Sequence, residues 1–268
     1  MMEMVGQKKI KTFLNKSTID TLPRTILLVG PAGCGKHLLC QGIAEKFALE
    51  MQDITEKLSL ENIQEIYQRT ILTLYVIDCT KITTREENVI LKFLEEPPKS
   101  AFIVLLAENT NYMLSTVVNR CYQIVFERYS REELSKFLVE NSDEKTIISI
   151  ADTPGQVRYL STQPLQEMNT LAEKVFLSIG NANFSNMLTI TNKIAFEGEK
   201  DKFDYKVFVK MLKHAIVSLI TKDGSKTVYY SAYKLTTDLV KAINTPNINA
   251  KMIFDHYLCC LQKTMRGN

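Results

Sequence analysis

The stretch "LLVGPAGCGKHLLCQGIAEKF", residues 27–47, decides the fold. An apolar run typical of a buried strand ends at Gly30, a glycine-rich loop follows, and apolar residues then return at helical spacing after Lys36. In this order of elements, backbone N–H groups, a helix N-terminus and a lysine can together bind phosphate. The stretch therefore predicts a nucleotide-binding loop with the candidate residues Gly30, Pro31, Ala32, Gly33, Cys34, Gly35, Lys36 and His37.

His37 is the unusual residue of this loop, because a serine or threonine commonly follows the lysine. The hydroxyl oxygen of that residue binds Mg²⁺, a hard ion that prefers oxygen ligands, and an imidazole supplies no oxygen. Two interpretations stay open. Either His37 is a tolerated polar residue and a water takes the place of the hydroxyl, or selection for hydrolysis has lapsed.

A second acidic position follows the apolar run "ILTLYVID", residues 71–78. Open α/β sheets place ligand groups at the carboxyl ends of their strands, so Asp78 is a candidate to hold Mg²⁺ through a water. The next residue is Cys79, where hydrolysing enzymes of this design commonly carry a carboxylate that polarises the attacking water. A neutral thiol is a poor base, although Cys79 is equally well explained as a small buried apolar residue. Together with His37, it predicts weak or static binding of ATP or ADP, with Mg²⁺ possible, and little hydrolysis.

A third apolar run, residues 101–109, follows the helical segment "REENVILKFLEEPP", which its two prolines end. Strands that alternate with helices predict an α/β domain whose parallel sheet is covered by helices on both faces. From about residue 130 onward the periodicities are helical. We therefore expect an α/β part followed by a helical remainder.

Composition excludes few function classes for this chain. Its 268 residues are 45% hydrophobic, enough for about two compact domains, and the net charge of +3 is too small to indicate nucleic-acid binding by itself. The six cysteines show neither a CxxC pair nor zinc-ligand spacing, which favours reduced thiols in a cytoplasmic protein and predicts no metal site. No apolar run reaches the roughly 18 residues of a membrane-spanning helix, so we expect a soluble chain.

The order of several motifs is more specific than any one of them. In sequence order, they resemble the AAA+ subunits of bacterial DNA polymerase III clamp loaders, and most of all the delta prime subunit. The segments that carry this resemblance are "GQKKIKTFL", "LLVGPAGCGK", "LYVIDCTKIT", "NVILKFLEEPPKSAFIVLLAEN", "LSTVVNRCYQIVF" and "TPGQVRYL".

The resemblance implies roles for three further residues. Arg120, in "NRC", matches an arginine that reaches the nucleotide of a neighbouring subunit and acts catalytically there, although Asn119 replaces the family's serine. Asn109 matches a sensor of the γ-phosphate, and Arg158 in "GQVR" matches a second sensor on the lid. Without the resemblance, Arg120 and Arg158 would be read as ordinary surface arginines and Asn109 as part of a turn.

The family also implies the domain order and the partners. The expected domains are an AAA+ RecA-like domain at residues 1–128, a helical lid at 129–163 and an all-helical collar at 164–268 that joins the subunits. The apolar residues of these helices could pack against partner helices, but the safer interpretation is that they form the core of their own domain. Many relatives carry a four-cysteine zinc module after the phosphate-loop helix, but residues 48–70 contain no cysteine, so no zinc is expected.

On this basis the chain is expected to be a delta prime-like stator of a hetero-oligomeric clamp loader in DNA replication. Its partners would be other AAA+ subunits, the sliding clamp and, through the assembly, primer–template DNA, but no membrane. One alternative is an active motor subunit of the gamma or tau kind, which predicts Mg²⁺-dependent ATP turnover that Lys36→Ala abolishes. A P-loop kinase would need an acceptor pocket and an arginine-rich lid, and the sequence indicates neither.

Overall fold

The computed structural model describes residues 5–111, 113–140, 143–181, 194–195, 203–223, 227–243 and 249–266. The chain divides into two compact units. One comprises Met1–Phe137 with Asp152–Arg158, and the other comprises Leu138–Ala151 with Tyr159–Asn268. The first unit therefore includes a short segment that follows part of the second unit in the sequence. The three-domain division expected from the sequence stays a prediction.

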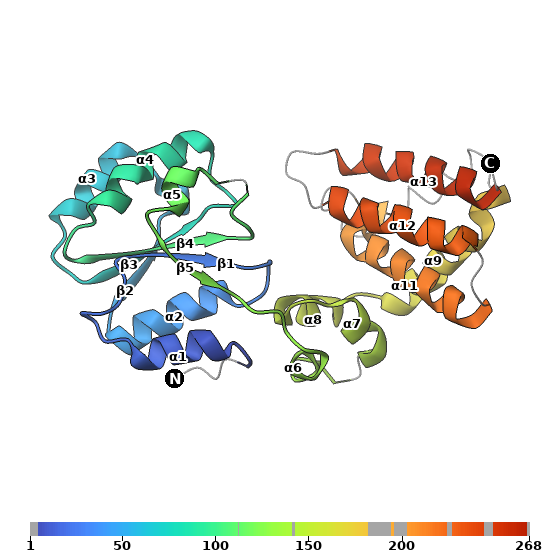
Figure 1. Ribbon diagram of the computed structural model, residues 1–268, viewed down its shortest axis with the longest axis horizontal. Coiled ribbons are helices and arrows are strands. Elements are labelled where there is room, and N and C mark those ends of the chain that lie inside the picture. The colour runs from blue at the N-terminus through green and yellow to red at the C-terminus, as the bar shows by residue number, and fades with distance from the viewer. Residues whose placement is uncertain are drawn as a thin grey trace. The chain divides into compact units, whose positions relative to one another are not determined.

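A five-stranded parallel sheet forms the centre of the first unit (Figure 1). Its order is β2-β3-β4-β1-β5, so β1 lies between β4 and β5. The parallel sheet expected from the alternating pattern is thereby confirmed. The strands are β1 (Thr25–Val29), β2 (Glu50–Asp53), β3 (Thr73–Asp78), β4 (Ala101–Ala107) and β5 (Tyr122–Val125).

The three inner strands are the three apolar runs of the sequence. β4 is buried along its whole length, and β3 is buried up to Asp78, because helices cover both faces of a parallel sheet. The edge strands β2 and β5 have the sequences EMQD and YQIV and are partly exposed. β2 is mostly polar, and both strands are only four residues long, so neither forms an apolar run as long as those of the inner strands.

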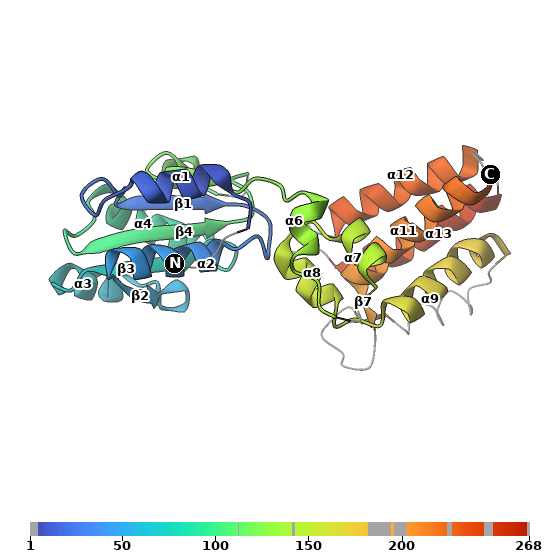
Figure 2. The same ribbon diagram turned by 90° about the horizontal axis from the view of Figure 1, so that it is seen from below.

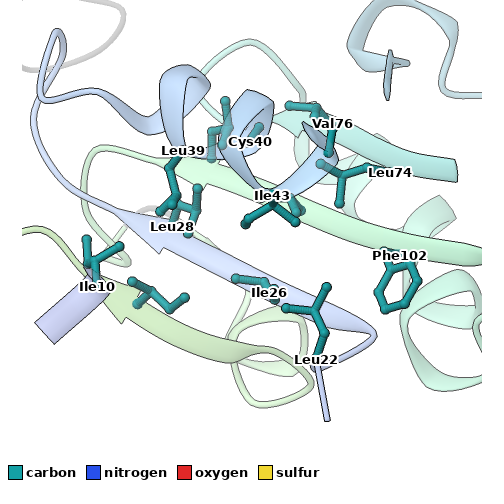
Figure 3. Close-up of a cluster of buried hydrophobic side chains, with 14 of the residues drawn as sticks. Ile10, Leu22, Ile26, Leu28, Leu39, Cys40, Ile43, Leu74, Val76 and Phe102 are labelled. Atoms are coloured by element: carbon teal, nitrogen blue, oxygen red, sulfur yellow. The ribbon is translucent and has the colours of Figure 1, made fainter. Parts of the chain in front are cut away.

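Helices cover both faces of the sheet, as expected. On one face pack α1 (Lys8–Lys16) and α2 (Lys36–Phe47), and Figure 3 shows Ile10, Leu39 and Ile43 against side chains of the strands. The other face carries α3 (Leu60–Gln68), α4 (Thr84–Glu95) and α5 (Ser115–Val118), and the 3₁₀ turn η1 (Thr55–Lys57) precedes α3. This two-sided burial fixes the strands that carry the candidate site.

Two short helices complete the first unit. α6 (Arg131–Ser135) begins with a capping box in which Ser130 and Glu133 bond each other's backbone N–H groups. The chain later returns with the first residues of α8 (Pro154–Leu160). That return brings the "TPGQVR" segment into the same unit as the glycine-rich loop.

In its described residues, the second unit is helical apart from one pair of two-residue strands. These are β6 (Ile194–Ala195) and β7 (Phe203–Asp204). Phe208 and Phe254 pack edge to face with ring centroids 6.2 Å apart, and Thr236 and Tyr257 share a buried hydrogen bond of 2.7 Å. The helical C-terminal part expected from the sequence is confirmed (Figure 2). Its elements are α7 (Glu144–Ile150), α9 (Leu165–Ser178), η2 (Ile179–Asn181), α11 (Tyr205–Asp223), α12 (Thr227–Ala242) and α13 (Ala250–Arg266).

Within the described ranges, none of the helices has the length and apolar character that crossing a membrane requires.

Candidate nucleotide site and arginine turn

The glycine-rich loop connects the end of β1 to the start of α2, as its sequence predicts. Gly33 has a φ of 76° and Gly35 a φ of 105°, both in the left-handed region that favours glycine. Gly35 is the N-cap of α2, so the first backbone N–H groups of that helix have no partner within it. Together with the positive end of the helix dipole, they form a cradle suited to phosphate.

Lys36 and Cys34 have different surroundings in the loop. The ammonium of Lys36 donates hydrogen bonds to the carbonyl oxygens of Gly30 and Pro31, so the side chain folds back along the loop. Cys34 is buried, and burial raises the pKa of its thiol although Lys36 lies close enough to oppose the shift. The thiol therefore stays protonated at neutral pH and serves as a packing residue.

Three consecutive carbonyl groups of the loop accept hydrogen bonds from residues far away in the sequence. Thr153 Oγ1 donates to Ala32 at 3.0 Å, the N–H of Gly155 donates to Gly33 at 3.0 Å, and Tyr129 Oη donates to Cys34 at 2.8 Å. These bonds hold the loop against the start of α8.

The contact between the loop and α8 is one of backbone against backbone. A Cβ added to Gly155 would lie 2.6 Å from the Cα of Gly33, closer than packed atoms allow. Thr153 beside it is fully buried. Within "TPGQVRYL", this segment contributes only to the family resemblance, and the sequence predicts no contact between it and the loop. Thr153, just before the helix that carries Arg158, and Gly155, in its first turn, were the available signal, but 122 positions separate Gly33 from Gly155.

A cavity of about 480 Å³ lies next to the loop, within the first unit. Of the candidate residues, Ala32 to His37, Asp78 and Arg158 line it. The guanidinium of Arg158 lies 5.8 Å from the ring centroid of Phe137, which lines the cavity too. The structure thus brings together the loop, the acidic strand end and the proposed lid arginine.

Asp78 is engaged in its own turn at the end of β3. Its Oδ1 accepts hydrogen bonds from the N–H of Thr80 at 3.1 Å and from Thr80 Oγ1 at 2.7 Å. The ammonium of Lys81 lies 3.9 Å from the other carboxylate oxygen.

Burial, helped by the nearby carboxylates of Glu87 and Asp78, raises the pKa of the Cys79 thiol far above its usual value. Cys79 cannot act as a base for water at neutral pH.

Asn109 lies outside the set of residues that line the cavity. It is exposed, and its Oδ1 accepts a hydrogen bond from the N–H of Asn111 at 3.0 Å, which closes a local turn after β4. Its neighbour Glu108 lines the cavity instead. The sensor role of Asn109 therefore stays a prediction from the resemblance.

Arg120 lies at the amino edge of the sheet, where the parallel strands begin, and the phosphate loop lies at the carboxyl edge, where they end. Thr25, the first residue of β1, donates a hydrogen bond from Oγ1 to the carbonyl of Arg120 at 2.7 Å, whereas the phosphate loop follows Val29, the last residue of that strand. Five residues of strand separate the two positions by about 13 Å. Arg120 is thus at the amino edge and the cavity at the carboxyl edge.

The guanidinium of Arg120 has two partners within its own unit. It donates from Nη1 to the carbonyl of Thr116 at 2.7 Å, and Nη2 forms an ion pair with Glu95. About a third of the side chain is exposed.

The residues present fit the phosphates of a nucleotide better than they fit its magnesium ion. The cradle of N–H groups and Lys36 suits a polyphosphate, and a Cβ at Gly33 would clash with Gly155 and Thr153. On the metal side, His37 offers no oxygen, and Asp78 shares one of its oxygens with Thr80. Within the part of the chain that the structure describes, no group of three or more His, Cys, Asp or Glu residues is arranged to hold a metal ion.

Comparison with known proteins identifies relatives among DNA polymerase III subunits. A family model described as "DNA polymerase III, delta subunit" matches residues 49–130. DNA polymerase III subunit gamma of Buchnera aphidicola subsp. Schizaphis graminum is 28% identical over 180 residues, 60% of this chain and 48% of that protein. DNA polymerase III subunit delta' of Bacillus subtilis is 31% identical over 128 residues, 46% of this chain and 35% of that protein. The chain thus spans about half the length of the gamma relative and a third of the delta' relative.

Solved structures show the same fold at low sequence identity. A gamma subunit-related protein from Thermotoga maritima superimposes with a TM-score of 0.51 at 17% identity, covering 98% of this chain and 100% of that one. The RuvB Holliday junction branch migration motor of Thermotoga maritima gives a TM-score of 0.50 at 16% identity, covering 81% and 76%.

The solved structures show that the chain shares its fold, an α/β domain followed by helices, with the gamma subunit-related protein and with RuvB. The sequence comparisons confirm that the chain resembles clamp-loader-type subunits of DNA polymerase III, and its relatives include both the gamma and the delta' kind.

Proposed function

We propose that the chain is a delta prime-like stator of a clamp loader in DNA replication. In this role it assembles with other AAA+ subunits in the cytoplasm, and the complex loads a sliding clamp onto primer–template DNA. Its own catalytic contribution is Arg120, supplied to the nucleotide of a neighbouring subunit. The gamma and delta' relatives support this proposal.

One observation carries the proposal: Arg120 and the phosphate loop lie at opposite edges of one sheet. Because about 13 Å of strand separates them, the guanidinium cannot serve the phosphates of its own chain. A partly exposed arginine that already binds a carbonyl oxygen and a carboxylate is suited to bind the phosphate oxygens of a neighbour. An arginine supplied in trans accelerates phosphoryl transfer about a thousandfold or more in related chemistry.

The site of the chain itself suits static binding. A bound ATP or ADP would supply phosphates to the glycine-rich cradle, with Lys36 and the start of α2 binding them and Arg158 lining the same cavity. Turnover would need a magnesium ligand at position 37 and a base at position 79. His37 lacks the oxygen, and the protonated thiol of Cys79 cannot accept the proton of an attacking water.

A gamma-like motor subunit is the second candidate, and a specific observation favours it. The gamma subunit of Buchnera aphidicola subsp. Acyrthosiphon pisum is 22% identical over 262 residues, 84% of this chain and 69% of that protein. This is a more extended match than that of the delta' relative. In this alternative, the isolated chain hydrolyses ATP and Lys36→Ala abolishes the activity.

Affinity purification of the tagged full chain with ATP and Mg²⁺, followed by mass spectrometry and an ATPase assay, tests the proposal. The stator proposal predicts that an AAA+ ATPase and a ring-shaped clamp are recovered with the chain. It also predicts that the rigorously purified chain alone shows no turnover. Recovery of the chain alone would contradict the assembly, and turnover by the isolated chain that Lys36→Ala removes would establish the motor alternative.

A further inference from the structure

The arginine turn, which runs from Leu114 through α5 to Arg120, is too short to be stable by itself. α5 is four residues long, and an isolated helix of that length does not persist in water. Its N-cap residue, Leu114, has no polar side-chain atom with which to bond the free N–H groups of the first turn. Something outside α5 must therefore hold it in place.

Glu87 of α4 provides that hold at the start of the turn. Its Oε2 accepts a hydrogen bond from the N–H of Leu114 at 2.7 Å. The residue is only 4% exposed, although glutamate is rarely buried without a partner. A hydrogen bond from a backbone N–H to a carboxylate is about twice as strong as one between neutral groups, so this contact is well suited to fix a chain segment.

Packing joins the two helices between their ends. Val117 of α5 is fully buried in the same apolar cluster as Ile90, Phe93 and Leu94 of α4. Figure 1 draws α5 beside α4 on this face of the sheet. The turn is thus packed against α4, while Thr25 of β1 binds the carbonyl of Arg120 at its end.

At the far end of the turn, α4 contacts the guanidinium itself. Glu95, the last residue of α4, forms the ion pair with Arg120. Glu87 and Glu95 are eight residues apart, which corresponds to about 12 Å along a helix. Leu114 and Arg120 are six residues apart, and carboxylates of this one helix contact both ends of the arginine turn.

We propose that Glu87 is a positioning residue for Arg120. By fixing the first N–H group of the turn from a buried site, it sets the direction in which the turn presents the guanidinium at the amino edge of the sheet. The catalytic part of this inference rests on the proposed function of Arg120 in trans. The structural part, that Glu87 orders the turn, stands independently of it.

Amide hydrogen exchange of the full chain tests the structural part. In Glu87→Ala, we expect the Leu114 amide to exchange at least tenfold faster, while the Val76 amide in the centre of β3 keeps its protection. Glu87→Gln retains an oxygen acceptor and should exchange at Leu114 within about threefold of the unchanged chain. Exposed Glu65 on α3 offers a matched control, since Glu65→Ala removes the same charge away from the turn. Unchanged exchange at Leu114 in Glu87→Ala would overturn the inference.

Turnover by the reassembled complex tests the catalytic part. Glu87→Ala should lower kcat at least tenfold with the KM for ATP within twofold, and Glu87→Gln should restore kcat to within threefold. If Arg120→Ala abolishes turnover while Glu87→Ala leaves it unchanged, the positioning role is refuted. If Arg120→Ala itself has no effect, the proposed function fails, and the exchange measurement alone decides whether Glu87 orders the turn.

Discussion

Both the carboxyl edge and the amino edge of the sheet carry residues suited to phosphate chemistry, but the two sets of residues differ in how complete they are. At the carboxyl edge, the phosphate cradle is well formed, but the groups that would complete hydrolysis are missing or engaged. His37 and Cys79 replace the usual hydroxyl and carboxylate residues, and Asp78 accepts hydrogen bonds from Thr80. At the amino edge, Arg120 is held by its own turn and by Glu95 of α4, and its side chain reaches the surface.

This difference indicates which function constrains each edge. A site that binds without turning over needs the cradle and the cavity but neither a magnesium hydroxyl nor a base. An arginine that serves a neighbour needs a fixed position, and the buried Glu87 is a costly residue to keep unless it has such a role. Under the proposed function, the chain therefore combines a non-hydrolysing site of its own with an arginine supplied to a neighbouring subunit.

The largest expected effect is that of Arg120→Ala on the assembled complex. Removing the guanidinium should lower ATP turnover about a thousandfold, because it would stabilise charge in the transition state of the neighbouring site. Arg120→Lys should recover only part of the rate, since an ammonium lacks the planar fork of donors. Steady-state ATPase assays of complexes that contain equal amounts of each variant provide the measurement. A rate that Arg120→Ala leaves unchanged would remove the functional contrast between the edges.

A smaller effect is expected at the contact that holds the phosphate loop. Gly155→Ala places a Cβ against the backbone of Gly33 and should lower the free energy of unfolding by about 1–3 kcal/mol. Gly42→Ala is the matched control, because a Cβ in α2 meets nothing within 4 Å and should stabilise the helix by about 0.5–1 kcal/mol. Chemical denaturation of the full chain compares them. Equal stabilities for the two variants would show that the close approach of loop and α8 is not tight.

The smallest effect is expected from giving the loop a hydroxyl oxygen. His37→Thr should make nucleotide affinity more dependent on Mg²⁺, by about tenfold or 1.4 kcal/mol, because the new oxygen can bind the ion. Turnover should stay absent, since Cys79 remains protonated. Isothermal titration with ATP, with and without Mg²⁺, measures the change, and His37→Ala serves as the control without an oxygen. Hydrolysis by the His37→Thr chain alone would show that the base at position 79 is dispensable.

The sequence predicted the parts of the fold that rest on local patterns. The apolar runs of β1, β3 and β4, the glycine loop and the helix that ends at two prolines each carry their own signal within about ten residues. β2 and β5 do not, because β2 is mostly polar and each strand is only four residues long.

The candidate site divides in the same way. Local motifs predicted the loop and Asp78, and the family resemblance implied Arg158; the structure gathers all of them at one cavity. The hydrogen bonds from Thr153 and Gly155 to the loop join residues more than 120 positions apart. In the sequence, Glu87 looks like any other helical glutamate, and only the fold shows that it is buried. Contacts of that range depend on tertiary packing, which no local pattern encodes.

ATP turnover by the complex that carries Lys36→Ala tests the central claim most directly, since it disables the site of this chain without touching Arg120. The account predicts that nucleotide binding by the isolated variant is lost while turnover by the complex stays within about twofold of the unchanged assembly. A loss of turnover as large as that of Arg120→Ala would contradict it, because the phosphate loop of this chain would then be a working ATPase site.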